Sequence, residues 1–474
     1  MVPNLIGDRW EEPRGAALPV YDPATGASIE SVPLSGAAEV DAAVRAAADA
    51  YPAWAATPVM ERARLMFRFK ALLEEHFEEL AAEVTRHHGK TLEEARGEVR
   101  RGIEVVDFAC GAPTLLQGRT LRQVSRAVDQ DLHRFPVGIV AGIPPFNFPA
   151  MIPLWMFPLA VVCGNAFVLK PSERTPLSAV RMARLFREAG FPPGVLNVVH
   201  GAGETASALV RHPGVQAVSF VGSEPVARAV YREAAASGKR VQALGGAKNH
   251  IVVMPDADPD VAIPAILGSA FGNAGERCLA GSVAVAVGEA AGFIPRLGSA
   301  AAALTVGPGD RAGVDVGPLI RDEHRRRVVE HIERAEREGG RILIDGRRYA
   351  RGPGFFLGPT VIDNVTPDMA VGREEVFGPV LSVARVGSLD DAIRHANRMA
   401  LGNMAVIFTQ SGRAAREFRE RVDAGMIGVN VPIAQPFAFF PFSGWKSSFF
   451  GDLHIHGTDG VEFYTRKKMV VTHW

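Results

Sequence analysis

Cysteine is scarce in this chain of 474 residues, which contains only three. So few cysteines exclude a disulfide framework and favour a reducing compartment. Cys110 and Cys163 lie in apolar surroundings, where a free cysteine usually behaves as a small buried hydrophobe. Cys278 stands instead in the small-residue turn FGNAGERCLA, beside Arg277, whose charge favours the reactive thiolate. We therefore predict that Cys278 is a nucleophile, although the turn alone leaves an unreactive structural cysteine open.

The chain also lacks an excess of charge of either sign, with 52 basic and 52 acidic residues. This balance offers no electrostatic attraction for nucleic acid or for an anionic membrane, so we predict neither as a partner. Long apolar runs are missing as well. The stretch 148–162 is short and contains three prolines, and the first residues lack the pattern of a secretory signal. We therefore expect a globular, cytoplasmic protein.

From residue 161 onward the sequence contains a regular alternation of strand and helix patterns. The first run predicts strands at 166–169, 195–199, 217–221 and 240–244, with helices at 178–189, 204–211 and 224–236. The second run predicts strands at 251–254, 341–345 and 405–409, with helices at 262–273 and 322–338. Such alternation is typical of βαβ units around a parallel sheet. Together with the length of the chain, it predicts two α/β lobes.

Signs of a nucleotide site occur in the first run. Residues 201–206 match the dinucleotide fingerprint only in part, and an ordinary tight turn explains them as well. The segment from Lys170 to Glu173 is more specific, because it closes an apolar strand, where open α/β sheets bind their ligands. A carboxylate there can accept hydrogen bonds from ribose hydroxyls and would repel a 2′-phosphate. The segment therefore favours NAD over NADP.

Five separated motifs resemble those of the aldehyde dehydrogenase superfamily in order and spacing. They are PFNFP from Pro145, KPSE from Lys170, FVGS from Phe220, NAGERC from Asn273 and EEVFGP from Glu374. The resemblance spans essentially the whole chain. Within the superfamily, further stretches are similar to the CoA-acylating branch, methylmalonate-semialdehyde dehydrogenase: PFNFPAMIPLWMFP at 145–158, GAKNH at 246–250, GVNVP at 428–432, and GD at 451–452 with FYT at 463–465.

This resemblance implies a three-part α/β architecture. A Rossmann-type NAD-binding lobe would comprise residues 1–117 and 138–246, and an α/β catalytic lobe residues 247–458. A β-hairpin at 118–137 and residues 459–474, with a terminal strand at 461–472, would form an oligomerisation element. A lone strand edge of this kind would be exposed in a monomer. We therefore expect a homo-oligomer, either a dimer or a tetramer formed as a dimer of dimers.

The resemblance also implies roles for single residues. Cys278 would attack the aldehyde, while the side-chain amide of Asn147 and the backbone N–H of Cys278 would stabilise the oxyanion, by roughly 3 kcal/mol per donor in comparable sites. Arg101 and Arg277 would grip a substrate carboxylate with paired hydrogen bonds, although either could be a solvated surface charge. The implied NAD contacts are Phe146, Lys170, Glu173, Arg174, Ser223, Gly245, Glu375 and Phe377. For Phe146 and Phe377, simple core packing is the alternative.

One departure from the superfamily pattern bears on the reaction. Hydrolytic members carry a glutamate before the paired glycines as the base for a deacylating water, whereas QALGG at 242–246 has no carboxylate. Water would be poorly activated there, while CoA can attack as a thiolate. We therefore predict NAD-dependent, CoA-acylating oxidation of malonate or methylmalonate semialdehyde through a cysteine thioacyl intermediate, with decarboxylation to acetyl-CoA or propionyl-CoA.

Two alternatives are a hydrolytic NAD-dependent dehydrogenase for another aldehyde and a non-catalytic protein on the same fold. The missing glutamate opposes the first, and retention of Cys278, Asn147, Lys170 and Glu375 opposes the second. The aromatic stretch 436–442 either reshapes the acyl pocket or simply packs. His454 and His456 have a strand-like spacing that would place both on one face, but no further ligand accompanies them, so we predict no metal.

Overall fold

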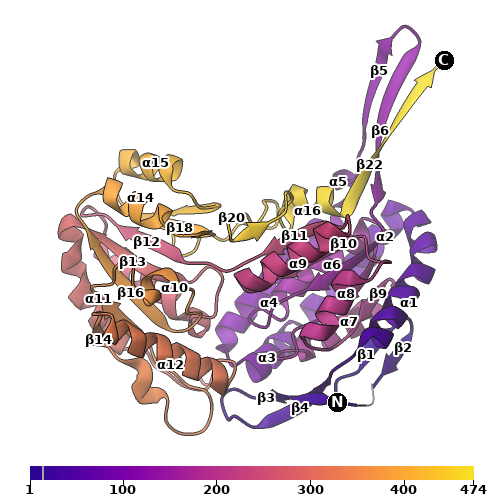
Figure 1. Ribbon diagram of the computed structural model, residues 1–474. Helices are drawn as coiled ribbons and strands as arrows, with labels where there is room; N and C mark the ends of the chain where they lie inside the picture. Colours follow the sequence, from indigo (N-terminus) through magenta and orange to yellow (C-terminus); the bar gives the residue numbers. More distant parts are fainter. Residues whose placement is uncertain (13–14) are drawn as a thin grey trace.

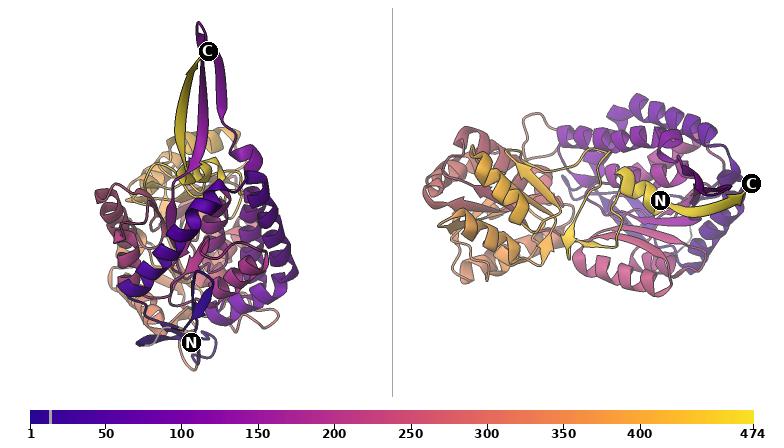
Figure 2. Two further views of the ribbon diagram at one scale, coloured as in Figure 1. Left: turned by 90° about the vertical axis from the view of Figure 1, so that its right-hand side faces the viewer. Right: turned by 90° about the horizontal axis from the view of Figure 1, so that it is seen from above.

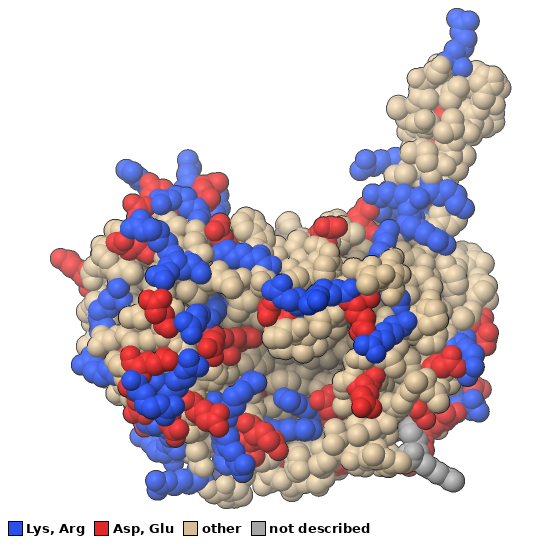
Figure 3. Space-filling model, in the orientation of Figure 1, with Lys and Arg blue, Asp and Glu red and all other residues tan. Residues whose placement is uncertain are grey.

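A computed structural model describes residues 1–12 and 15–474. The chain forms two α/β lobes side by side, and a long β arm projects from the first of them (Figures 1 and 2). Basic and acidic side chains are interspersed over both lobes on the face shown in Figure 3, and basic side chains gather at the base of the arm. Among the described residues, no helix is both long and apolar enough to cross a membrane.

The first lobe is built on an eight-stranded sheet with the order β2-β1-β9-β8-β7-β10-β11-β21. Five central strands are parallel: β7 (Ile139–Ile143), β8 (Ala166–Leu169), β9 (Leu196–Val198), β10 (Ala217–Val221) and β11 (Arg240–Leu244). The edge strands β1 (Asn4–Ile6), β2 (Arg9–Glu11) and β21 (Phe449–Phe450) are antiparallel to their neighbours. The chain adds β8 and β9 on one side of β7, and β10 and β11 on the other. This order creates the switch point at which such sheets bind ligands.

Helices cover both faces of this sheet, which explains why its strands are apolar on both sides. One layer contains α1 (Ala37–Ala56), α8 (Gly203–Arg211) and α9 (Glu224–Ala236). The other contains α2 (Val59–Glu75), α3 (Phe77–His88), α4 (Leu92–Cys110), α6 (Met151–Val162) and α7 (Leu177–Glu188). The predicted limits of β8, β10, β11 and α9 are confirmed, and Cys110 and Cys163 are buried as predicted.

The second lobe contains a seven-stranded sheet with the order β14-β15-β16-β13-β12-β18-β19. Its strands are β12 (Asn249–Val253), β13 (Gly281–Val287), β14 (Arg341–Ile344), β15 (Thr360–Asp363), β16 (Val380–Val386), β18 (Met404–Phe408) and β19 (Met426–Val429). Only the edge strand β14 pairs antiparallel. One face packs against α14 (Leu389–Asn397) and α15 (Gly412–Arg421), the other against α10 (Pro259–Phe271), α11 (Ile294–Ala302) and α12 (Asp322–Arg337). The expected two-lobed α/β fold is confirmed.

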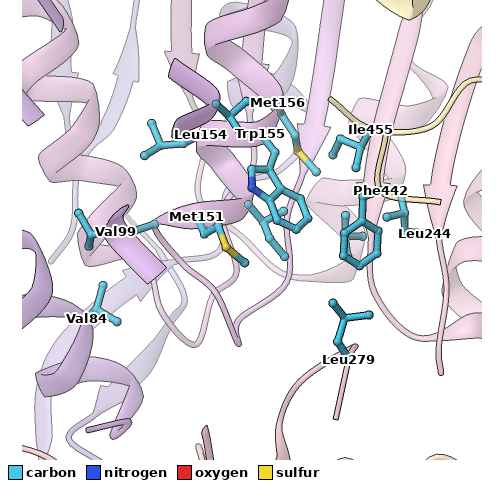
Figure 4. Packing of buried hydrophobic residues seen from close by; sticks show 14 of the residues in the cluster. Val84, Val99, Met151, Leu154, Trp155, Met156, Leu244, Leu279, Phe442 and Ile455 are labelled. Carbon is cyan, nitrogen blue, oxygen red and sulfur yellow. The ribbon is translucent and has the colours of Figure 1, made fainter. Parts of the chain in front are cut away.

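The apolar core continues from one lobe into the other. Met151 and Trp155 of α6 lie close to Phe442 and Leu279, and all four belong to one buried cluster (Figure 4). Because these residues come from both lobes, their packing sets how the lobes face each other. Leu279 follows Cys278 in the chain, so this shared core also anchors the cysteine loop.

The arm is a three-stranded sheet of β5 (Arg119–Ser125), β6 (Val128–Pro136) and β22 (Thr465–His473). The terminal strand begins later than predicted, because the segment 461–464 belongs to the helix α16 (Gly457–Tyr464). The hydroxyl of Thr465 donates to the carbonyl of Val461 at 2.7 Å, as in a helical turn, and the buried ring of Tyr464 lies in the core. Burial of these apolar side chains on the body of the lobe outweighs their preference for strand.

The expectation that His454 and His456 share one strand face is wrong. The segment is irregular, and His456 has a φ of 49°. His454 stacks on Phe449 with the ring centres 4.3 Å apart, whereas His456 is buried against Trp155. In the ranges 1–12 and 15–474, no cluster of three or more acidic, histidine or cysteine side chains could hold a metal ion.

Candidate active site

Cys278 lies in a loop between the strained turn η1 (Gly272–Gly275) and β13, and this segment is hydrogen-bonded to Asn147 of the first lobe. Asn273 has a φ of 56°, in the left-handed region that costs a non-glycine residue energy. Gly275 is needed, because a Cβ atom at this position would lie 2.1 Å from the carbonyl oxygen of Gly378. The small residues of the predicted turn therefore allow a close approach of backbone to backbone, and Cys278 stays partly exposed.

Side-chain amides from both lobes hold this loop. The Nδ2 atoms of Asn249 and Asn403 each donate to the carbonyl of Cys278 at 2.9 Å. Nδ2 of Asn147, just beyond the end of β7, donates to the carbonyl of Glu276 at 2.9 Å. The structure thus brings together the two residues that the sequence predicted as catalytic. The amide of Asn147 is buried and lies beside the peptide that leads to Cys278.

A buried ion pair that the sequence analysis did not identify supports Asn147. Lys90 Nζ donates to the carbonyl of Asn147 at 2.7 Å and to the carboxylate of Glu98 at 2.5 Å. The other oxygen of Glu98 accepts from the N–H groups of Ala150 and Met151, at 2.8 and 3.1 Å. Removal of either charge would leave the other buried and unpaired, which is strongly destabilising. No local pattern marks the role of this pair, because its contacts with Asn147, Ala150 and Met151 form only when α4 packs on the segment 147–151.

Arg277 favours the thiolate as predicted, because its charge lowers the pKa of Cys278. Burial, and then the negative charge of Glu375, outweigh this effect and raise the pKa of Cys278 to about 12. The guanidinium of Arg277 is engaged elsewhere, since it donates to Glu94 Oε1 and to the carbonyl of Gly268, both at 3.2 Å. Burial and Glu375 therefore favour the neutral thiol of Cys278 over its thiolate.

The predicted NAD contacts of the first lobe stand at the carboxyl ends of parallel strands. Phe146, Lys170, Ser223 and Gly245 follow β7, β8, β10 and β11, respectively. Lys170 Nζ lies 3.4 Å from Glu173 Oε2, and the Glu173 side chain remains partly exposed. Ser223 precedes α9, and its hydroxyl makes no capping hydrogen bond there. The N-terminal turn of α9 is thus a suitable site for an anionic group.

The second lobe brings Glu375 and Phe377 to the same region. The rings of Phe377 and Phe146 are nearly perpendicular with centres 5.9 Å apart, and the Arg174 guanidinium lies 5.1 Å from the Phe146 ring. Glu375 Oε1 accepts from the N–H of Ala247 at 2.9 Å, and burial raises the pKa of this carboxyl to about 7. Phe146 and Phe377 thus contact each other, and Phe146 also contacts Arg174, another of the predicted NAD contacts.

A cavity of about 230 Å³ lies beside Cys278 on the side of α4 and α6. Arg101 and Arg277 both line it, so the structure unites the two arginines that the sequence predicted for a substrate carboxylate. Arg101 donates to Glu104 at 2.9 Å. Since a guanidinium carries five N–H donors, each arginine retains donors for a second carboxylate. Apolar walls come from Met151, Trp155, Leu279 and Phe442, as Figure 4 shows.

The sequence model described as "Aldehyde dehydrogenase family" matches residues 10–470. The chain belongs to the aldehyde dehydrogenase family. Malonate-semialdehyde dehydrogenase 2 of Geobacillus kaustophilus is 54% identical over 475 residues, which cover 99% of this chain and 98% of that protein. The crystal structure of methylmalonate-semialdehyde dehydrogenase from Oceanimonas doudoroffii superposes with a TM-score of 0.98 at 48% identity, covering 100% and 98% of the two chains.

A further aldehyde dehydrogenase structure was determined with its cofactor. It is assigned as a methylmalonate-semialdehyde dehydrogenase of Sinorhizobium meliloti 1021 complexed with NAD, and it is 45% identical with a TM-score of 0.97. The superposition covers 99% of this chain and 97% of that one. The family fold therefore extends over the complete described chain, arm included.

For this aldehyde dehydrogenase, the structure clarifies the segment that lacks a glutamate. Ala243 is buried in the layer of α9, whereas Leu244 points to the opposite face and lies near Leu279 and Phe442 (Figure 4). The two carboxylates that line the cavity are already engaged, Glu94 with Arg277 and Glu98 with Lys90. Neither is placed as a free base for water.

Alkylation of the free enzyme by iodoacetamide tests the state of the thiol. Because the pKa of Cys278 is raised to about 12, its thiolate fraction should grow about tenfold per pH unit, and the labelling rate should rise steadily from pH 7 to pH 10. Peptide mapping by mass spectrometry would separate Cys278 from the other two cysteines. Glu375→Gln should accelerate labelling at pH 9, since one charge that opposes the thiolate is lost. A plateau near pH 8.5 would contradict this prediction.

Proposed function

We propose that this protein catalyses NAD-dependent, CoA-acylating oxidation of malonate or methylmalonate semialdehyde. The observation that carries the proposal is a cavity lined by Cys278, Arg101 and Arg277, beside which the buried amide of Asn147 is hydrogen-bonded to the cysteine loop. Among the described residues that line this cavity, both carboxylates are engaged with basic side chains. The names of the relatives support the same substrate class, since they are malonate- and methylmalonate-semialdehyde dehydrogenases.

Each step has a residue suited to it. Cys278 loses its thiol proton to water and its sulfur adds to the aldehyde carbon, while the Asn147 amide together with the Cys278 N–H stabilises the oxyanion. NAD supplies the hydride acceptor, so that oxidation leaves a thioester on the cysteine. The carboxylate in the β position of this thioester would then leave as CO2, and the same donors would stabilise the resulting enolate. The enolate carbon takes a proton from water to give the acetyl or propionyl thioester. Attack by the CoA thiol releases acetyl-CoA or propionyl-CoA and regenerates the Cys278 thiol.

The substrate carboxylate would lie between Arg101 and Arg277. Their free N–H groups can form paired hydrogen bonds with a carboxylate, and both line the cavity that contains Cys278. Arg277 is the more rigid of the two, because Glu94 and the Gly268 carbonyl hold it and its side chain is only 17% exposed. The two arginines would select a carboxylated aldehyde over a neutral one.

The residues of the crevice fit an NAD cofactor. Lys170 and Glu173 would bind the adenosine ribose, Arg174 and Ser223 would lie on the adenosine and pyrophosphate side, and Glu375 would bind the nicotinamide ribose. Phe377 would pack beside that ribose. Phe146 and the backbone at Gly245 would line the channel, since a Cβ at Gly245 would lie 2.8 Å from the carbonyl of Ser447 and leave no space for a side chain.

Glu173 should determine the choice between NAD and NADP. Although burial opposes its charge, Lys170 and Arg174 hold the pKa of Glu173 below the ordinary value, so the group is a carboxylate at neutral pH. This charge should repel the 2′-phosphate of NADP and make kcat/KM more than about tenfold higher with NAD. Glu173→Gln should narrow that preference. A native enzyme that favours NADP would contradict the assignment.

The arm supports the proposal of a homo-oligomer, as a dimer or a dimer of dimers. Large apolar side chains are exposed along it, among them Leu121, Met469 and Val471, each more than half exposed. A second subunit would bury these side chains and pair the free strand edge. We propose residues 118–137 and 459–474 as the oligomerisation element, 1–117 and 138–246 as the NAD-binding domain, and 247–458 as the catalytic domain. Three free cysteines fit a cytoplasmic location.

An NADH-production assay over a panel of aldehydes, with and without CoA, tests the proposed function. Malonate and methylmalonate semialdehydes should be oxidised with a higher kcat/KM than propanal, and an acyl-CoA should be formed. The semialdehyde with the higher kcat/KM is then identified as the preferred substrate. Preference for a neutral aldehyde with release of a free acid would favour the hydrolytic alternative.

A further inference from the structure

The aromatic stretch 436–442 contacts the helices α4 and α6, which border the substrate cavity, at three points. The guanidinium of Arg101 lies 4.4 Å from the ring centre of Phe437. The ring of Phe439 meets Phe108 edge-on with the centres 5.9 Å apart, and Phe442 packs on Trp155 at 5.3 Å. The stretch therefore lies against α4 and α6 rather than extending freely into solvent.

The two contacts on α4 lie on one side of that helix. Arg101 and Phe108 are seven residues apart, which is two helical turns, so both side chains leave the same face. Phe439 on Phe108 fixes the stretch along this face, and Phe437 consequently meets Arg101. The stretch thus acts as one unit that touches a cavity-lining arginine.

The polar contacts of Arg101 hold its side chain less firmly than those of Arg277 hold the Arg277 side chain. Its polar partner in the described structure is Glu104, a half-exposed residue one turn along the same helix, and the Arg101 side chain is itself 31% exposed. Surface pairs of this kind hold a long side chain only weakly. Arg277, by contrast, is held by hydrogen bonds to Glu94 and to a backbone carbonyl. A ring stacked on Arg101 supplies a restraint that its salt bridge lacks.

Stacking also leaves the arginine free to bind. A guanidinium contacts an aromatic ring through its flat face, whereas its N–H donors point outward in its plane. Phe437 can therefore fix the orientation of Arg101 without occupying the donors that a carboxylate needs. A polar partner in the same place would compete with the substrate.

We propose that Phe437 is a positioning residue that holds Arg101 for the carboxylate of the substrate and so sets the preference for carboxylated over neutral aldehydes. This inference rests on the proposed function, in which Arg101 contacts that carboxylate. Phe437 acts through Arg101 and takes no part in the chemistry at Cys278. Its effect should therefore fall on KM rather than on kcat.

The test compares Phe437→Leu with Phe440→Leu in the full-length enzyme. Phe440 is a matched control, because it belongs to the same stretch and is 66% exposed, against 56% for Phe437, yet it makes no aromatic or cationic contact among the described residues. The substrates are malonate semialdehyde and propanal, which have the same number of carbon atoms and differ in the carboxylate. Saturating NAD and CoA are present throughout.

Phe437→Leu should raise KM for malonate semialdehyde by about threefold to tenfold, the loss expected for one cation–π contact, with kcat retained and propanal unaffected. Phe437→Tyr, which keeps the ring, should behave like the native enzyme, and Phe440→Leu should change nothing. An unchanged preference in Phe437→Leu would overturn the inference. So would an equal loss in Phe437→Tyr, since a steric role would then explain both.

Arg101→Gln separates failure of this inference from failure of the proposed function. Loss of preference in Arg101→Gln with none in Phe437→Leu would refute only the positioning role. No loss in Arg101→Gln would refute the proposed carboxylate contact, and the inference with it. Thermal denaturation of each variant checks that the changes in KM do not reflect unfolding.

Discussion

Cys278→Ala is expected to abolish NADH formation, with a fall in kcat of more than about 10⁴-fold, because the proposed thioacyl intermediate cannot form without the thiol. NAD should still bind, since the residues of the cofactor crevice lie on other loops. NADH absorbance over a long incubation measures the first effect, and a direct binding assay for NAD measures the second.

Cys110→Ala is the matched control. Cys110 is also a free cysteine with a pKa raised to about 12 by burial, but it lies at the end of α4 and outside the cavity lining. This variant should keep native turnover, with at most a modest loss of stability from the missing sulfur. Substantial turnover by Cys278→Ala, or an equal loss in Cys110→Ala, would rule out Cys278 as the nucleophile.

Without CoA, the enzyme is expected to release a burst of about one NADH per active site and then turn over slowly. Oxidation should form the thioester on Cys278, whereas the two carboxylates among the described residues that line the cavity are engaged with basic side chains and are not free to activate water. Stopped-flow absorbance measures the burst, and intact-protein mass spectrometry should detect the acylated enzyme. Addition of CoA should restore steady turnover and give an acyl-CoA. Full-speed turnover without CoA, with release of a free acid, would contradict the acylating assignment.

Introduction of a carboxylate should shift the reaction towards hydrolysis if it reaches the thioester. The sequence leaves open whether position 243 or 244 is the relevant one. In the structure the two side chains point to opposite faces of the sheet, so Ala243→Glu and Leu244→Glu cannot both reach the cavity. Comparison of the acid-to-acyl-CoA ratio in these two variants identifies the position from which a base could act.

Strand and helix positions in the first lobe were predictable because their signals are local. Strands covered on both faces are largely apolar, as in β8 and β10, and the limits of α9 follow from its flanking polar and glycine residues. The predicted start of the terminal strand at residue 461 was wrong, because its true start at residue 465 does not depend on a local signal. Its first four residues carry a strand-like composition, but burial against the lobe decides their conformation, and no local pattern reports that burial.

Motif order likewise predicted which residues form the candidate site, but not how they interact. Asn147 and Glu276 are 129 positions apart, and their hydrogen bond depends on the packing of one lobe on the other. The pair of Lys90 and Glu98 gave no signal at all, because a lone lysine and a lone glutamate are ordinarily solvated.

By itself, the sequence determined the class of fold, the loop that contains the proposed nucleophile and the absence of a glutamate before the paired glycines, since each is a matter of residue type and order. Only the tertiary structure decided the protonation state of Cys278 and the surroundings of the arginines. Those properties depend on burial and on charges brought close in space, such as Glu375 beside the thiol and Phe437 on Arg101. Glu375, which is distant from Cys278 in the chain, therefore affects the pKa of Cys278 more than the neighbouring Arg277 does.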